Sequence, residues 1–247
     1  MSLSSLSEPI THQLAHRLSI LCKRWNLQPA DITAGALLWL AWTGTTWLAF
    51  ALSLLFVEIG ETGEVSWLEA ALGGCWVGVS RWLVLRPYLR HPTRWIIATV
   101  ASWLLLVLLH LCAVGWVVPG TPNLLLRGGF GVLYGGYVGL GLGLGQWWGL
   151  RSQVHQAWRW IPLNAGIWAI GIALAWITGG WLRAASGLFL GEVVGLLIGW
   201  GAIAALSGIG IVGLLYESKG EDKLKRYPSS RALTAAKSNA PGSKSPY

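Results

Sequence analysis

The residues best suited to chemistry are Glu192 and His110, because both lie inside long apolar segments. Ionisable side chains within membrane spans are costly to bury and tend to be functional. At about 1.5 Å per residue, Glu192 lies roughly 8 Å below the end of its segment near Gly187, and His110 reaches a comparable depth counted from Trp95. We therefore expect that the two side chains could pair. The alternative is a neutral, hydrogen-bonded histidine and a glutamate in a water-filled dip.

No catalytic motif accompanies these two residues. The sequence has no HExxH, no GxSxG, no paired aspartates and no phosphate loop with its lysine. Its cysteines, Cys22, Cys75 and Cys112, are too widely spaced for a metal-ligand pattern. We therefore expect no enzyme and no metal site. No cofactor is implied, although a lipid or an apolar pigment is left open as a ligand.

The composition is typical of a polytopic membrane protein. Of 247 residues, 54% are hydrophobic and 11% are charged, whereas a soluble domain carries about 25% charged residues. Six segments are long enough to cross a bilayer, which takes roughly 20 apolar residues each. They cover residues 34–57, 67–86, 95–118, 128–150, 160–182 and 184–216. We predict an all-α domain of six transmembrane helices over 34–216, its last helix tilted, protruding or broken near Ser207, Gly208 and Gly210.

Two polar regions flank this domain. Residues 1–33 carry apolar side chains at steps of three or four between basic ones, which predicts an amphipathic helix, either interfacial or simply solvated. Residues 217–247 are rich in lysine, serine and proline, and we expect a disordered basic tail.

The basic residues divide unevenly between the two sides of this arrangement. Only Arg127 and Arg183 fall on one side, and the other cations near the spans or in the tail fall on the opposite side. Because positive loops resist translocation, both termini are predicted to be cytoplasmic. The net charge of +8 suits anionic lipid headgroups, and no nucleic-acid-binding signature accompanies it.

Glycines recur at every fourth position, which places them on one ridge of a helix. Each would cost a water-exposed helix about 1 kcal/mol relative to alanine, but in a membrane it lets a neighbouring backbone approach closely. The central ridge is Gly131, Gly135, Gly139 and Gly143; related ridges are Gly74 and Gly78 upstream and Gly187, Gly191, Gly195 and Gly199 downstream.

The ridges belong to a longer internal repeat. A shift of 65 residues superimposes Trp82 on Trp147, Arg86 on Arg151 and Trp95 on Trp160, so the repeating unit is a helical hairpin. Copies cover about 66–118 and 128–182. A degenerate third copy at 184–216, where the ridge returns 56 residues later, completes three hairpins.

A glycine ridge followed by (Gln/Arg)-Trp-x-x-Leu-Arg and Arg-Trp-Ile resembles the Trp- and Gly-rich repeat membrane proteins of bacteria, cyanobacteria especially. The residues that carry the resemblance are Arg81, Trp82, Arg86, Arg94 and Trp95 in one copy and Gln146, Trp147, Arg151, Arg159 and Trp160 in the other. The resemblance implies an integral membrane protein, in the bacterial plasma membrane or the thylakoid, and no established reaction.

Many tryptophans fall near the two predicted membrane boundaries, where indole rings anchor helices at the headgroups. The motif arginines could bind lipid phosphates there. Arg81 and Gln146 lie one turn inside the boundary and could reach outward or line a pore. The boundary tryptophans are Trp82, Trp95, Trp147, Trp148, Trp158 and Trp160 on the cytoplasmic side and Trp67, Trp116 and Trp181 on the other. Deeper ones, which a bound apolar molecule could use, are Trp42, Trp76, Trp103, Trp168 and Trp200.

We therefore expect a non-enzymatic membrane protein that acts by helix packing and association, as a scaffold, an assembly factor or a regulatory subunit. Its expected partners are the lipid bilayer, other membrane subunits or a second copy of itself. The alternative is a small-solute or proton-coupled transporter or channel that uses Glu192 and His110. A lipid-modifying enzyme comes third.

Overall fold

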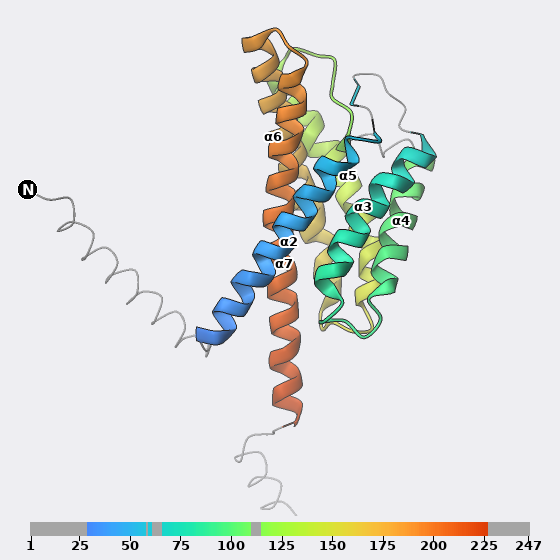
Figure 1. Ribbon diagram of the computed structural model, residues 1–247, viewed down its shortest axis with the longest axis vertical. Coiled ribbons are helices and arrows are strands. Elements are labelled where there is room, and N and C mark those ends of the chain that lie inside the picture. The colour runs from blue at the N-terminus through green and yellow to red at the C-terminus, as the bar shows by residue number, and fades with distance from the viewer. Residues whose placement is uncertain (1–28, 58, 61–65, 110–114, 227–247) are drawn as a thin grey trace, which may run out of the picture.

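The computed structural model describes residues 29–57, 59–60, 66–109 and 115–226, and this part of the chain is all-helical (Figure 1). Its helices are α2 (Pro29–Ser53), α3 (Trp67–Leu85), α4 (Thr93–Leu108), α5 (Leu124–Leu150), α6 (Trp160–Ser186) and α7 (Leu190–Arg226), with a short 3-10 turn, η3 (Ala157–Arg159), before α6. The prediction of an all-α fold is thereby confirmed.

Three helical segments are long and apolar enough to cross a membrane: Asp31–Ser53, Ala157–Ser186 and Leu190–Ser218. The helices α3 and α4 are shorter, at 19 and 16 residues. The helix α5 has 27 residues, but its many glycines lower its mean hydropathy. These findings are compatible with a membrane location, whereas six spans and the orientation of the termini stay predictions.

The helices form a closed ring. Each one packs against the next along the chain, and α2 packs against α7 to close the circle. Figure 1 shows α2 crossing α7 diagonally, and α7 running on beyond the other helices. The ring encloses two groups of buried side chains. We call the group nearer the α6–α7 turn the upper core; it includes Phe50, Trp103, Trp116, Trp168 and Trp200. The lower core, nearer the α3–α4 turn, includes Trp42, Leu85, Trp95, Leu150 and Trp160.

The third predicted span, 95–118, is too long, because α4 ends at Leu108. From Gly115 the described chain is not in an α-helix, and the N–H of Val118 donates to the carbonyl of Gly60 at 3.1 Å. Trp116 is fully buried in the upper core, where its indole N–H donates to Ser53 Oγ at 3.0 Å. Its predicted place at the membrane boundary is therefore wrong.

The fourth span begins earlier than predicted, at Leu124 instead of residue 128, because Asn123 caps it. The Asn123 side chain accepts hydrogen bonds from the backbone N–H groups of Leu125 and Leu126, at 3.0 and 3.2 Å. Such a cap satisfies N–H groups that the first helical turn otherwise leaves free. The earlier start brings Arg127 into the helix.

The last predicted span also has different bounds. Gly187, at φ +70°, ends α6 in the left-handed conformation that favours glycine, so residues 184–186 belong to α6. The helix α7 is continuous past Ser207, Gly208 and Gly210 and protrudes to Arg226, which leaves the expected break absent. Residues 217–226, predicted as disordered tail, are therefore helical. The rest of that tail and residues 1–28 lie outside the described residues.

Candidate functional site

Glu192 lies in the first turn of α7 and is fully buried. It faces α6 at Gly179, where an added Cβ atom would come within 2.6 Å of Glu192 Oε2. A glycine at 179 therefore makes the room that the carboxylate occupies.

Arg127 on α5 is the partner of Glu192. Its Nη1 and Nη2 donate to Oε2 and Oε1 of Glu192 at 2.8 and 2.7 Å. The remaining N–H groups donate to three backbone carbonyls: Nε to Thr121 at 2.7 Å, Nη1 to Trp176 at 3.0 Å and Nη2 to Pro119 at 2.8 Å. Since a guanidinium has five N–H donors, every donor of Arg127 has an acceptor.

A second cation, Arg183 on α6, lies beside this ion pair. Its Nη1 is 3.7 Å from Glu192 Oε1, and 39% of its side chain is exposed. The Arg183 guanidinium also lies over the Phe189 ring, 5.5 Å from the ring centre. Breaking a buried ion pair leaves an uncompensated charge, which costs about 3–5 kcal/mol. The geometry is therefore that of a structural lock joining α5, α6, α7 and residues 119–121.

His110, the partner expected from sequence, lies outside the described residues. Sequence reasoning missed Arg127 because it counted that residue in a loop, one position before the predicted span. The signal that could have found it was Asn123, a capping residue whose recognition moves the helix start ahead of Arg127.

A second group of buried polar residues, which we call the polar layer, takes one side chain from each helix. Its members are Thr46 on α2, Arg81 on α3, Thr99 on α4, Gln146 on α5, Asn164 on α6 and Ser207 on α7, and each is at most 1% exposed. Buried polar groups normally find hydrogen-bond partners, and Gln146 does so with three of its neighbours. Its Nε2 donates to Thr99 at 3.4 Å, and its Oε1 accepts from Trp160 Nε1 at 2.8 Å and from Asn164 at 3.5 Å.

Three tryptophans from alternate helices form a closed triangle against this layer. The ring centres of Trp42, Trp95 and Trp160 are 5.9, 6.1 and 6.4 Å apart. Aromatic pairs at such separations favour tilted and edge-to-face geometries. The expected anchoring of Trp95 and Trp160 at a membrane boundary does not fit this arrangement, because both rings are buried inside the bundle.

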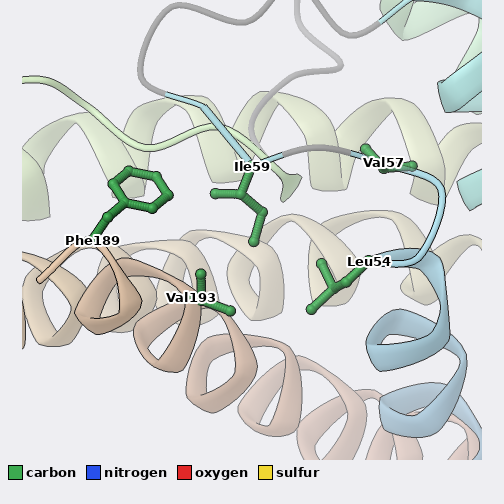
Figure 2. Close-up of a pocket in the computed structure, with 5 residues that line it drawn as sticks. All are labelled: Leu54, Val57, Ile59, Phe189 and Val193. Carbon is green, nitrogen blue, oxygen red and sulfur yellow. The ribbon is translucent and has the colours of Figure 1, made fainter.

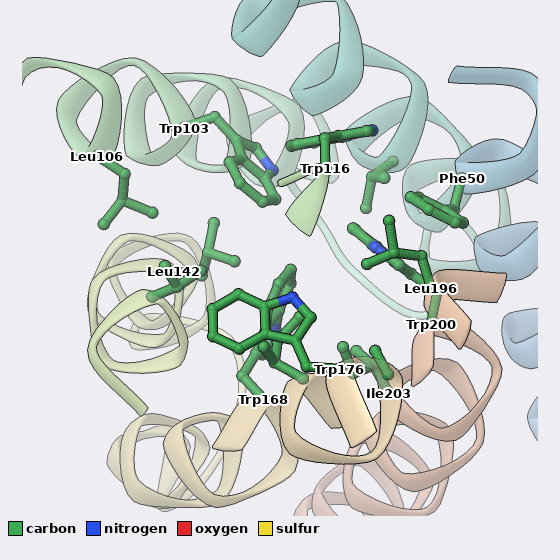
Figure 3. Close-up of a cluster of buried hydrophobic side chains, with 14 of the residues drawn as sticks. Phe50, Trp103, Leu106, Trp116, Leu142, Trp168, Trp176, Leu196, Trp200 and Ile203 are labelled. Carbon is green, nitrogen blue, oxygen red and sulfur yellow. The ribbon is translucent and has the colours of Figure 1, made fainter. Parts of the chain in front are cut away.

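Further tryptophans fill the upper core, which Figure 3 shows. Trp168 lies between Trp103 and Trp200, with ring centres 5.6 and 5.1 Å away, and Phe50 stacks on Trp200 at 4.4 Å. Of the deep tryptophans expected from sequence, only Trp76 is partly exposed, at 38%. The rings of Trp148, Trp158 and Trp181 are exposed, as membrane anchors would be.

Arg81 does not reach outward from the bundle as predicted. Its side chain is buried, its guanidinium carbon is 4.9 Å from the ring centre of Trp42, and its Nε donates to Thr46 Oγ1 at 3.3 Å. The other motif arginines, Arg86, Arg94, Arg151 and Arg159, are exposed, whereas Trp82 and Trp147 are partly buried.

The glycine ridges lie in three different helix interfaces. A Cβ added at Gly131, Gly139 or Gly143 of α5 would come within 3.0 Å of a Cα atom of α6, and Gly135 also faces that backbone. Gly74 and Gly78 of α3 face Trp103 and Thr99 of α4. On α7, Gly191, Gly195 and Gly199 face α6, whereas Gly187 is open. The third ridge faces the preceding helix and the first two face the following helix, so the 56-residue shift does not superimpose equivalent contacts.

An apolar pocket of about 340 Å³ lies beside the ion pair (Figure 2). Leu54, Val57 and Ile59 line it from the end of α2 and the chain that follows, and Phe189 and Val193 line it from the start of α7 and the residue before it. Its lining suits the acyl chain of a lipid, in line with the lipid ligand left open by the sequence.

The fold and site define a helical bundle with three membrane-length helices, a buried ion pair and a central polar layer. Searches of protein-family models, curated proteins and solved structures found no match to this chain. Among the described residues, no group of three His, Cys, Asp or Glu side chains could hold a metal ion.

Proposed function

We propose that this chain is a non-enzymatic integral membrane protein that acts by association, as a scaffold, an assembly factor or a regulatory subunit. The observation that carries the proposal is a stripe on the outer face of α5, which we call the α5 stripe. It consists of Gly129, Leu133, Gly136 and Leu140, at the spacing that lines one face of a helix. Leu133 and Leu140 are 58% and 41% exposed.

The two glycines of the α5 stripe have no neighbour inside the chain. A Cβ added at Gly129 or Gly136 would meet nothing within 4 Å, whereas Gly131 and Gly139 on the same helix leave room for α6. A glycine inside a helix costs about 1 kcal/mol relative to alanine. On a membrane-facing surface, that cost is offset when a second helix packs closely on the small residues.

The ion pair also favours association over transport. Both carboxylate oxygens of Glu192 already accept hydrogen bonds from Arg127. A proton or solute that binds Glu192 would have to break a bidentate, charge-assisted contact of the strong kind.

The finer features of the sequence interpretation are part of the same proposal. They are six spans with both termini cytoplasmic, three repeated hairpins with glycine-ridge packing, and membership of the Trp- and Gly-rich bacterial membrane proteins. The uneven placement of the basic residues supports the orientation. The equal contacts of Gly74 with Trp103 and of Gly139 with Trp168 support the repeat.

Site-specific photo-crosslinking in native membranes tests this function. A photoreactive residue at Leu133 should give a discrete crosslinked band, because the α5 stripe would lie against another helix. A matched probe at Ile209 of α7, which is 61% exposed, should give only lipid adducts. Equal crosslinking at both positions, or none at Leu133, would contradict the proposal.

Proton-coupled or small-solute transport is the second candidate, and Arg183 is the observation in its favour. Its partly exposed side chain, 3.7 Å from Glu192, connects the buried carboxylate to the surface. Reconstituted protein should then show pH-dependent flux that Glu192→Gln abolishes while the variant stays folded. No flux in the wild type under any gradient would exclude this candidate.

A further inference from the structure

Two of the three indoles in the tryptophan triangle have an acceptor in the polar layer. Trp160 Nε1 donates to Gln146 Oε1 at 2.8 Å, and Trp42 Nε1 donates to Ser207 Oγ at 2.9 Å. The third indole differs: Trp95 Nε1 is buried and has no hydrogen-bond partner.

The register of the helices explains this difference. Trp95 and Arg81 precede Trp160 and Gln146 by the same 65 residues, and the packing between the helices repeats as well. Gly78 faces Ile96 and Thr99, just as Gly143, 65 residues later, faces Ile161 and Asn164. Arg81 on α3 therefore occupies the place opposite the Trp95 indole that Gln146 on α5 occupies opposite Trp160.

This place holds donors and lacks an acceptor. Gln146 offers a carbonyl oxygen to its indole, but a guanidinium has only N–H donors and stays protonated in proteins. Arg81 Nη2 is itself buried without a partner, and no carboxylate in the described part of the chain pairs with Arg81. A buried charge of this kind requires compensation.

We propose that a small monovalent anion, chloride under cellular conditions, binds between Arg81 Nη2 and the indole N–H of Trp95. The anion supplies both the missing acceptor and the missing negative charge, whereas a water molecule would supply only the acceptor. A lipid phosphate does not fit, because Arg81 is 1% exposed and lies between the two cores. The site is independent of the proposed association through α5.

Thermal unfolding of the purified full chain tests this site at constant ionic strength. The wild type should unfold several degrees higher in sodium chloride or bromide than in sodium gluconate, whose anion is too large for the site. Arg81→Gln, which introduces the amide found at position 146, should lose this difference. Arg86→Gln, at an exposed arginine of the same chain region, should keep it.

Equal wild-type unfolding temperatures in chloride and gluconate would overturn the proposal, and so would an undiminished difference in Arg81→Gln. Anomalous diffraction from bromide-soaked crystals of the wild type provides a measurement that does not depend on a variant. A bromide peak within hydrogen-bonding distance of Arg81 Nη2 is expected, and its absence there would also overturn the proposal.

Discussion

Arg127 and Glu192 are 65 residues apart in the sequence, yet two hydrogen bonds of 2.8 and 2.7 Å join their side chains inside the bundle. The pair links α5 to α7 through a gap that Gly179 and Gly180 leave in α6, since a Cβ at either position would come within 2.8 Å of one of the two side chains. Small residues thus admit a buried ion pair at a point where three helices meet.

Glu192→Gln should lower the free energy of unfolding by about 3–5 kcal/mol, because it leaves the Arg127 guanidinium buried without a counter-charge. Chemical denaturation in detergent micelles measures this loss. The control is Glu217→Gln, which breaks an ion pair with Arg159 whose side chains are 56% and 47% exposed. An exposed pair contributes at most about 1 kcal/mol, so equal losses in the two variants would show that the buried pair is not a lock.

Gly139→Leu should destabilise the fold, because a Cβ at this position would already lie 2.5 Å from the Asn164 carbonyl oxygen. Overpacking typically costs about 1–3 kcal/mol, and more is expected where backbones touch. The control is Leu140→Ile on the exposed face of the same helix. If thermal stability and expression of Gly139→Leu equalled those of the control, α5 would not pack on α6 as described.

The sequence was sufficient to predict the helical class, the apolar character of the spans and the importance of Glu192. It was not sufficient for the partner of Glu192, because depth arithmetic cannot tell which neighbouring helix faces a given residue. Arg127 reaches Glu192 only because Asn123 starts α5 early and residues 119–121 lie close enough for two carbonyls to accept from its guanidinium.

The burial of Trp95 and Trp160 was also missed, for a different reason. A tryptophan near the end of an apolar segment fits a membrane boundary as well as a bundle core. The pattern that separates the two is the eight-residue spacing from Trp95 to Trp103 and from Trp160 to Trp168, which places both rings of each helix on one face. Two large aromatic residues on the face that also carries Thr99 or Asn164 indicate a core-facing surface.

Trp160→Phe should be more destabilising than Trp95→Phe when both are measured in chloride-free gluconate buffer. The first substitution removes the donor to Gln146 Oε1, and a buried group that loses its partner costs about 1–3 kcal/mol. The second removes an N–H that has no partner within the described chain, although the lost ring area is the same. Equal losses would contradict the hydrogen-bonding assignment of the polar layer.

Cysteine labelling should divide the two ends of the bundle between two compartments, as the distribution of basic residues predicts. In a background without Cys22, Cys75 and Cys112, Ser186→Cys should react with a membrane-impermeant maleimide in intact cells. Ser152→Cys, at the other end, should react only after permeabilisation. The reverse pattern would invert the proposed orientation.

The most direct test of the proposed function is the native mass of the protein after gentle extraction from its membrane. The wild type should be recovered in a complex heavier than its own 26.7 kDa. Gly136→Leu, which places a bulky side chain in the open part of the α5 stripe, should shift it to the monomer without lowering its unfolding temperature. A wild type recovered only as a 26.7 kDa monomer, or a complex unaffected by Gly136→Leu, would contradict association through α5.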